Sequence, residues 1–143
     1  MTFDDEPIHA ATLSATVEWR TIHPGAQLVW EESHDEELGL GMVDFDPSAY
    51  VRQWFQVADP WPAVAYGYRR RMDGFGWRER EQIPDVWWEW SHPDRPGDRF
   101  DLILRKPGPG MFWPAGIRDG TTVFDLRYVR SRLPSNAADP PHA

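Results

Sequence analysis

Apolar and polar residues alternate along several short stretches of the chain, and this is the period of a half-buried β-strand. The clearest case near the start is the segment 10–22, in which Leu13, Ala15, Val17 and Trp19 fall on one face. Threonine, serine and charged residues fall on the other face. The alternation predicts a strand over residues 10–22.

A tight turn follows this first segment. Residues 24–25 are Pro-Gly, and glycine accepts the positive φ that the third position of a type II turn needs. Residues 26–32 then return as a second predicted strand, which places Trp30 opposite Trp19. The acidic run over residues 31–37 predicts a solvated loop, because like charges do not pack against one another.

One stretch has helical spacing. Residues 46–48 are Asp-Pro-Ser, which supplies a carboxylate for the N-cap and a proline for the first helical position. Between residues 50 and 58 the apolar side chains recur at intervals of three and four. Pro60 must end the segment, because a residue before proline avoids the α region. The pattern predicts one short helix near residues 47–58.

A hairpin is predicted in the middle of the chain. Residues 73–74 are Asp-Gly, a strong signal for a two-residue turn between antiparallel strands. The flanking strands are predicted over residues 62–71 and 76–83. The remaining predicted strands cover residues 38–45, 86–90, 99–105 and 121–130.

These elements favour a mainly β fold, with α+β as the looser description. We expect an antiparallel sheet that curls into a small barrel or half-barrel and carries the single helix; a β-sandwich is the alternative. The length of 143 residues suits one domain. We assign residues 10–132 to that globular domain, 1–9 to an acidic flexible lead-in and 133–143 to a flexible tail.

Composition excludes several kinds of chemistry. The chain has no cysteine, so disulfides, thiolate metal sites and cysteine nucleophiles are excluded. His23, His34 and His92 lie far apart in sequence and fit no metal-binding spacing. We therefore predict no metal and no cofactor. The sequence has neither a long apolar run nor a signal-peptide pattern, which predicts a cytoplasmic protein without a membrane partner.

The charge is placed unevenly. The first 46 residues hold eleven acidic side chains and one arginine, whereas the other 97 carry +2, for a net charge of −8. This sign repels phosphate backbones, so we expect no nucleic-acid partner. The acidic front suits a basic protein partner, and a solubilising surface is the alternative.

The predicted hairpin carries the candidate catalytic residues. Counting outward from its turn puts Tyr66 and Tyr68 on the same face as Glu79 and Glu81, and that face has the apolar content expected of a core. Burying a carboxylate costs several kcal/mol unless it is paired, and burial raises its pKa toward the range useful for acid–base catalysis. The alternative is a position near the rim of the sheet, where the tyrosine hydroxyls and Arg70 satisfy the carboxylates.

Nine tryptophans are an unusual number for a chain of this length. In the strand 86–90, Trp88 and Trp90 share a face while Trp87 lies on the other. Aromatic side chains in such numbers line pockets for flat apolar or cationic groups, although core filling is the alternative. The candidate substrate-binding residues are Arg70, Trp77, Trp88, Trp90, Trp30 and Trp113.

Two functional hypotheses follow. The first is a small-molecule-binding domain with an aromatic-lined pocket for an apolar or aromatic ligand. Its more specific form is a cofactor-independent acid–base enzyme that cyclises or isomerises an aromatic or polycyclic substrate. The alternative is an acidic inhibitor of the immunity type that neutralises a basic protein. Its candidate contact residues are Glu31, Glu32, Asp35, Glu36, Glu37 and Trp87. A homodimer is left open.

Overall fold

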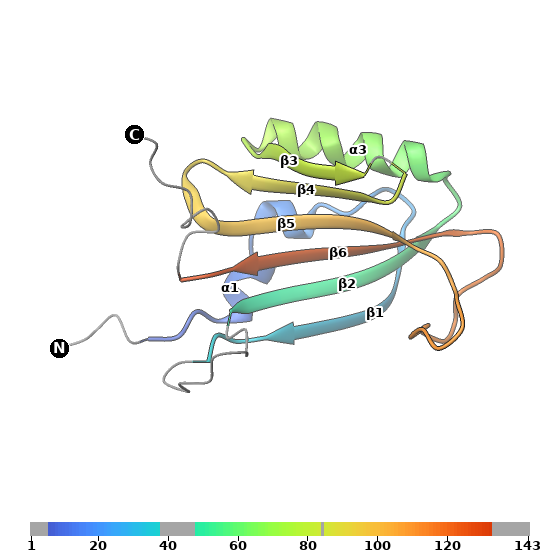
Figure 1. The fold of residues 1–143 in the computed structure, drawn as a ribbon, viewed down its shortest axis with the longest axis horizontal. Coiled ribbons are helices and arrows are strands. Elements are labelled where there is room, and N and C mark those ends of the chain that lie inside the picture. Colours follow the sequence, from blue (N-terminus) through green and yellow to red (C-terminus); the bar gives the residue numbers. More distant parts are fainter. Residues whose placement is uncertain (1–5, 38–47, 84, 133–143) are drawn as a thin grey trace.

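A single antiparallel sheet organises the molecule, with strand order β1-β2-β6-β5-β4-β3 (Figure 1). The computed structural model describes residues 6–37, 48–83 and 85–132. The strands are β1 (Gln27–His34), β2 (Ala49–Val57), β3 (Arg78–Ile83), β4 (Trp87–His92), β5 (Arg95–Arg105) and β6 (Thr122–Arg130). The helices are α1 (Ala10–Ser14), α2 (Val17–Arg20) and α3 (Trp61–Gly74).

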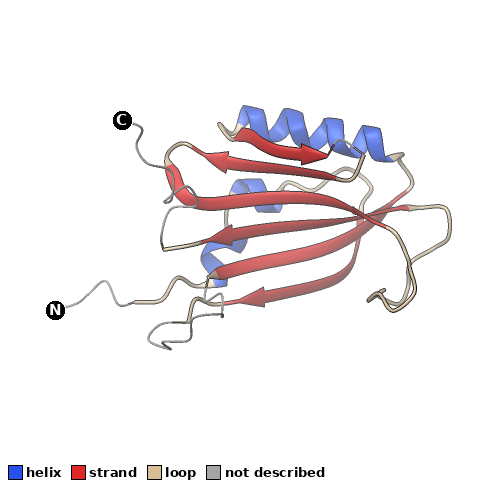
Figure 2. Cartoon of the chain, in the orientation of Figure 1, coloured by secondary structure: helices blue, strands red, loops and turns tan. Residues whose placement is uncertain are grey.

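The prediction of a mainly β, antiparallel fold is confirmed. The sheet is open rather than closed, because β1 and β3 each have only one neighbouring strand among the described residues. The structure is therefore a sheet with helices packed on it (Figure 2), and neither a barrel nor a sandwich.

The core lies between the helices and one face of the sheet, here called the helix-side face. It is formed on the sheet by Val51 and Phe55 of β2, Phe100 and Leu102 of β5, and Phe124, Leu126 and Tyr128 of β6. The three helices add the buried side chains Leu13, Trp19, Val64, Tyr68 and Met72. Phe124 sits centrally, stacked on Phe55 with ring centroids 5.5 Å apart and edge-on to Tyr68 at 5.8 Å.

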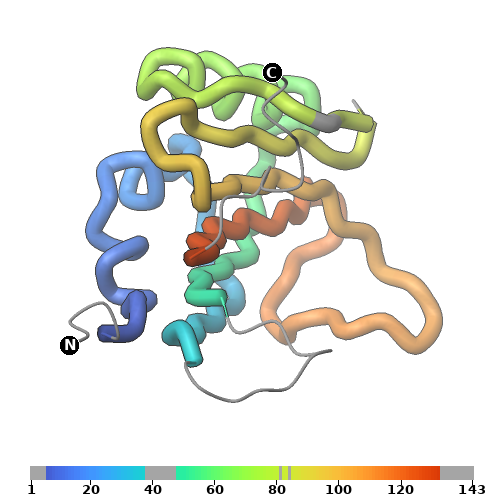
Figure 3. The backbone as a smooth tube through the Cα atoms, turned by 60° about the vertical axis from the view of Figure 1, so that its left-hand side comes forward, coloured from blue at the N-terminus to red at the C-terminus, as the bar shows by residue number. Residues whose placement is uncertain are grey.

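The opposite face of the sheet, here called the loop-side face, carries a second layer of buried and partly buried side chains. It includes Trp30, Arg52, Trp54, Asp101, Arg105 and Asp125. The segment 106–121 lies on this side, and Figure 3 shows it across the strands from α1. The Asp125 carboxylate is fully buried and accepts hydrogen bonds from Arg52 at 3.0 Å and from Arg105 at 2.8 Å. A buried carboxylate with two guanidinium partners is a satisfied ionic group.

The predicted helix near residues 47–58 is wrong, because β2 occupies that segment. β2 lies between β1 and β6, and both of its faces are covered. Val51 and Phe55 are buried on the helix-side face, while Trp54 is buried on the loop-side face. A strand that is buried on both faces loses the alternation that identifies a strand, and its apolar residues then mimic helical spacing.

The first strand of the predicted hairpin is also wrong, since residues 61–74 form α3. Pro60 is the N-cap and Pro62 stands in the first turn, where proline is tolerated. The buried stripe of α3 is Val64, Ala65, Tyr68 and Met72, which is the spacing of one helical face. The second predicted strand, 76–83, corresponds to β3.

The predicted strand over 10–22 is replaced by the short helices α1 and α2. The Thr16 hydroxyl caps α2 by accepting from the backbone N–H of Trp19. Trp19 packs edge-on against Phe100 rather than opposite Trp30, which pairs with Trp54.

Four predicted strands are confirmed as β1, β4, β5 and β6. β1 continues to His34, so the acidic run over 31–37 is strand in its first half rather than loop. The predicted strand 38–45 and the predicted tail lie outside the described residues. The helices in the described part of the chain lack the length and apolar character needed to cross a membrane.

Candidate functional site

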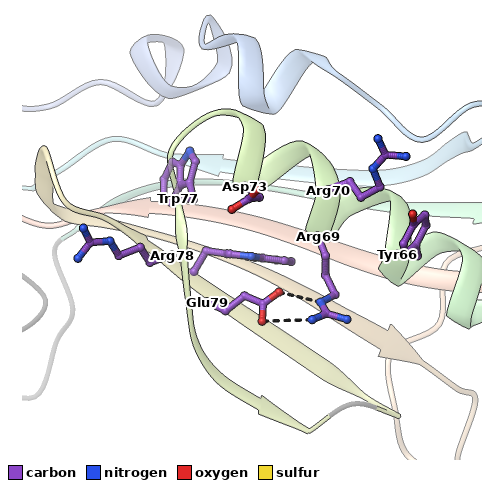
Figure 4. Close-up of a pocket in the computed structure, with 8 residues that line it drawn as sticks. Tyr66, Arg69, Arg70, Asp73, Trp77, Arg78 and Glu79 are labelled. Atoms are coloured by element: carbon purple, nitrogen blue, oxygen red, sulfur yellow. Dashed lines mark hydrogen bonds and ion pairs between the residues drawn. The ribbon is translucent and has the colours of Figure 1, made fainter.

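A cleft of about 560 Å³ lies between α3 and β3 (Figure 4). Most of its lining residues are polar or aromatic, and three are arginines. They are Tyr66, Arg69, Arg70 and Asp73 from α3, Trp77 from the connection after it, Arg78 and Glu79 from β3, and Trp90 from β4.

The helical period of α3 explains how its side chains reach the cleft. Arg69 and Arg70 each lie three or four positions from both Tyr66 and Asp73, so the four side chains share one face of the helix. The buried stripe of α3 occupies the other face. Tyr66 is 60% exposed, and Figure 4 shows it projecting from α3 on the same side as Arg70.

One arginine of the cleft is held by an ion pair. Arg69 donates to both carboxylate oxygens of Glu79, at 2.7 and 3.4 Å (Figure 4). Its guanidinium also lies 4.1 Å from the ring centroid of Trp88, within the range of a cation–π interaction. These contacts fix Arg69 against β3 and β4.

The other two arginines are differently placed. Among the side chains that the structure describes, Arg70 and Arg78 have no carboxylate partner. The guanidinium of Arg70 lies over the ring of Tyr66 at 5.6 Å. Among the described side chains, Asp73 and Glu79 are the lining carboxylates, so three arginines face two acidic groups there.

The floor of the cleft is aromatic and rigid. Trp77 and Trp90 are almost fully buried, so only their edges reach the cleft. The indole N–H of Trp77 donates to Glu18 Oε2 at 2.9 Å, and Arg95 pairs with the same oxygen at 3.1 Å. Glu18 therefore links α2 to the cleft floor and fixes the orientation of Trp77.

The Glu18 carboxyl belongs to a buried polar network. Burial by itself raises its pKa, but the hydrogen bond from Trp77 and the charge of Arg95 outweigh burial and lower the pKa overall. Arg95 also donates a hydrogen bond to the hydroxyl of Tyr128, and this hydroxyl donates to Asp98. Burial and the bond to Asp98 raise the pKa of Tyr128 to about 12, so this hydroxyl stays protonated as a donor.

Replacing Glu18 tests this network through the pH dependence of stability. A carboxyl whose pKa is lowered in the folded state stabilises the fold above its unfolded-state pKa, and this contribution is lost as the pH falls through the folded-state pKa. We expect Glu18→Gln to cost about 2 kcal/mol of unfolding free energy at neutral pH. Below pH 4.5 the difference from the parent protein should shrink. Urea unfolding at a series of pH values measures it. The exposed control Glu6→Gln should show no such trend, and a Glu18→Gln deficit independent of pH would contradict the assignment.

The candidate catalytic residues are only partly brought together. Tyr66 and Glu79 line the cleft. Tyr68 lies on the opposite face of α3, in the core, where its oxygen accepts from the backbone N–H of His23 and burial raises its pKa to about 12. Residues two apart in a helix point in different directions, whereas in the predicted strand they shared a face. Glu81 lies in β3, and its side chain is outside the described part.

The candidate substrate-binding residues divide between two places. Arg70, Trp77 and Trp90 line the cleft, and Trp88 lies next to it beneath Arg69. Trp30 and Trp113 lie on the loop-side face, where both adjoin Trp54. Arg69 and Asp73 line the cleft but were missed from the sequence, because they share a face with Tyr66 only if the segment is helical. Arg78 of β3 also lines the cleft and was missed.

The candidate partner-binding acids make contacts within the molecule. Asp35 accepts from the backbone N–H of Ala10 at 2.7 Å, and this bond lowers its pKa. Glu36 accepts from the N–H of Ile8 and pairs with Arg132. The remaining members contact neighbours on the sheet or nearby: Glu31 contacts Gln53, Glu32 contacts Arg52, Glu37 contacts His34, and Trp87 contacts Asp101.

Comparison with protein families, curated proteins and solved structures finds no match to this chain. In the described part of the chain, no three histidine, aspartate or glutamate side chains gather as metal ligands.

Proposed function

We propose that the protein binds a small aromatic anion in the cleft between α3 and β3. The observation that carries the proposal is the pair Arg70 and Arg78, two guanidiniums that line an aromatic-floored cleft without a carboxylate partner among the described side chains. This is the small-molecule hypothesis with the ligand's charge specified.

The charge of the ligand follows from the arginines. A guanidinium presents a planar fork of donors that matches the two oxygens of a carboxylate or the oxygens of a phosphate. Arg69 is already held by Glu79, whereas Arg70 and Arg78 extend from different elements, α3 and β3. Figure 4 shows the two side chains directed toward different ends of the cleft, so each offers a separate position for the anionic group.

The aromatic part of the ligand follows from the remaining lining. Trp77 and Trp90 supply a rigid apolar floor, and Tyr66 supplies an exposed ring at the side. Ligand sites of this kind combine apolar surface with a few polar groups that fix orientation. A cleft of about 560 Å³ accommodates a molecule of one or two fused rings with an acidic group.

Binding is better supported than acid–base catalysis. Of the four candidate catalytic residues, Glu79 is the described carboxylate that reaches the cleft, and both of its oxygens accept from Arg69. This arrangement suits a residue that positions Arg69. The cyclisation or isomerisation hypothesis therefore keeps Glu79 and Tyr66 as its residues, but the proposed function is ligand binding.

Titration calorimetry with 2-naphthoate as the probe and neutral 2-naphthamide as the matched compound tests the proposal. We expect the carboxylate to bind about tenfold more tightly than the amide, since a charge-assisted bidentate contact is worth more than about 1.4 kcal/mol. At least one of the variants Arg70→Ala and Arg78→Ala should remove most of this preference. Arg20→Ala, which changes an exposed arginine on α2, serves as the control and should leave it intact.

Two results would overturn the proposal. One is equal affinity for the carboxylate and the amide. The other is an unchanged preference in both Arg70→Ala and Arg78→Ala, which would place the anion elsewhere.

A further inference from the structure

Among the described residues, β1 has a backbone edge without a neighbouring strand. It is the outermost strand beside β2 (Figure 1), and over residues 27–34 its backbone pairs only with β2 within the described part of the chain. An edge of this kind offers a row of N–H and C=O groups to another extended chain. The other edge strand, β3, has Arg69 of α3 paired to its Glu79 and forms a wall of the cleft.

An aromatic hollow lies on the loop-side face next to this edge. It has a volume of about 390 Å³ and is lined by the apolar side chains of Trp30, Trp54, Met111 and Phe112, together with Glu32, Arg52 and Arg105. Met111 and Phe112 are about half exposed, and the Phe112 ring lies 5.1 Å from that of Trp30. This hollow suits an apolar side chain.

A second hollow lies on the helix-side face of the same strand pair. It has a volume of about 300 Å³, and its lining includes Ser14, Glu31, Ser33 and Gln53. Glu31 is exposed, with a single hydrogen bond from Gln53 at 3.2 Å. Glu32 and Arg52 also line this hollow, so two glutamates accompany one arginine, and the net negative charge suits a basic side chain.

Successive side chains of a strand point to opposite faces. A chain added alongside β1 therefore directs alternate side chains toward the two hollows. We propose that β1 binds an extended segment of a partner protein in which basic and apolar residues alternate, by addition of a strand to the sheet. Backbone hydrogen bonds would supply affinity, and the two hollows would supply specificity. This surface is separate from the α3–β3 cleft.

Charge favours a basic partner over a second copy of this chain. β1 carries exposed Glu31 and Glu32, and exposed Glu37 follows it. Two β1 strands side by side would bring like charges together, which disfavours pairing between copies. Acidic residues and the irregularity between Leu28 and Trp30 also protect the edge from aggregation. Protection of the edge alone would not account for the two hollows that lie beside β1.

The test uses fluorescence anisotropy with a dye-labelled octapeptide of alternating lysine and valine. We expect saturable binding with a dissociation constant below about 1 mM. A glutamate–valine octapeptide should bind at least about tenfold more weakly because of charge. The lysine–valine peptide with all its amide nitrogens methylated should also bind at least about tenfold more weakly, because it lacks backbone donors. Hydrogen exchange should show protection of the β1 amides in the complex.

Variants of the two hollows complete the test. Glu31→Gln and Phe112→Ser should each lower the affinity for the lysine–valine peptide by about three- to tenfold. Tyr66→Ser, an equally exposed aromatic on α3, is the matched control and should have no effect. The proposal is overturned if binding does not saturate, if the methylated peptide binds as well as its parent, or if neither hollow variant weakens binding.

Discussion

Phe124→Ala is expected to lower the free energy of unfolding by about 3–5 kcal/mol. Phe124 is fully buried at the centre of β6, where its ring meets Phe55 of β2 and Tyr68 of α3. Truncating it leaves a cavity between the sheet and the longest helix, and both the lost apolar burial and the cavity destabilise the fold. Chemical denaturation with tryptophan fluorescence as the signal measures the loss.

Phe112→Ala is the matched control, because Phe112 is 54% exposed at the surface of the loop-side face. We expect it to cost less than about 1 kcal/mol. An equal loss in the two variants would contradict the placement of Phe124 in the core.

Asp125→Ala should destabilise the protein by about 3 kcal/mol or more. Asp125 is the neighbour of Phe124 in β6, but it lies on the other face of the sheet. The side chain of Asp125 points to the loop-side face, where its fully buried carboxylate joins Arg52 and Arg105. Removing it leaves the guanidinium of Arg105, about three-quarters buried, without its counter-charge, and leaves that of Arg52 with Glu32 at 3.8 Å. Leaving such charges unpaired costs more than the pair itself contributes.

Asp119→Ala removes an exposed carboxylate from the 106–121 segment and should change stability by less than about 0.5 kcal/mol. Thermal unfolding of the two aspartate variants side by side makes the comparison. A neutral Asp125→Ala would show that the carboxylate does not hold the two arginines. Large losses at both Phe124 and Asp125 would confirm that β6 is buried on both faces by different chemistry.

Burial on both faces also explains where sequence patterns succeeded. β5 and β6 were predicted because Phe100, Leu102, Phe124 and Leu126 alternate with charged residues. Those charged residues belong to the ionic layer on the loop-side face, but in the sequence they keep the alternation of apolar and polar residues that identifies a strand. β2 lacks this contrast, since Trp54 faces the ionic layer while Phe55 faces the core. Its pattern therefore resembled a helix.

The error at α3 had more effect on the site. Val64, Tyr66 and Tyr68 alternate by chance with small or charged residues, and the Asp-Gly pair at 73–74 lies at the C-terminal end of the helix rather than in a hairpin. Only tertiary packing decides between the two patterns in this segment. The predicted hairpin nevertheless placed Tyr66 and Arg70 close to Glu79 and Trp77. The structure also places them together, because α3 and β3 are neighbours in the fold.

Indole N–H signals in a nitrogen-15 NMR spectrum test the proposed binding site most directly. On titration with 2-naphthoate, we expect the indole signals of Trp77 and Trp90, identified by Trp→Phe variants, to shift. The signals of Trp30 and Trp54 on the loop-side face should stay unchanged. Shifts confined to Trp30 and Trp54, or no shifts at all, would contradict an anion-binding cleft between α3 and β3.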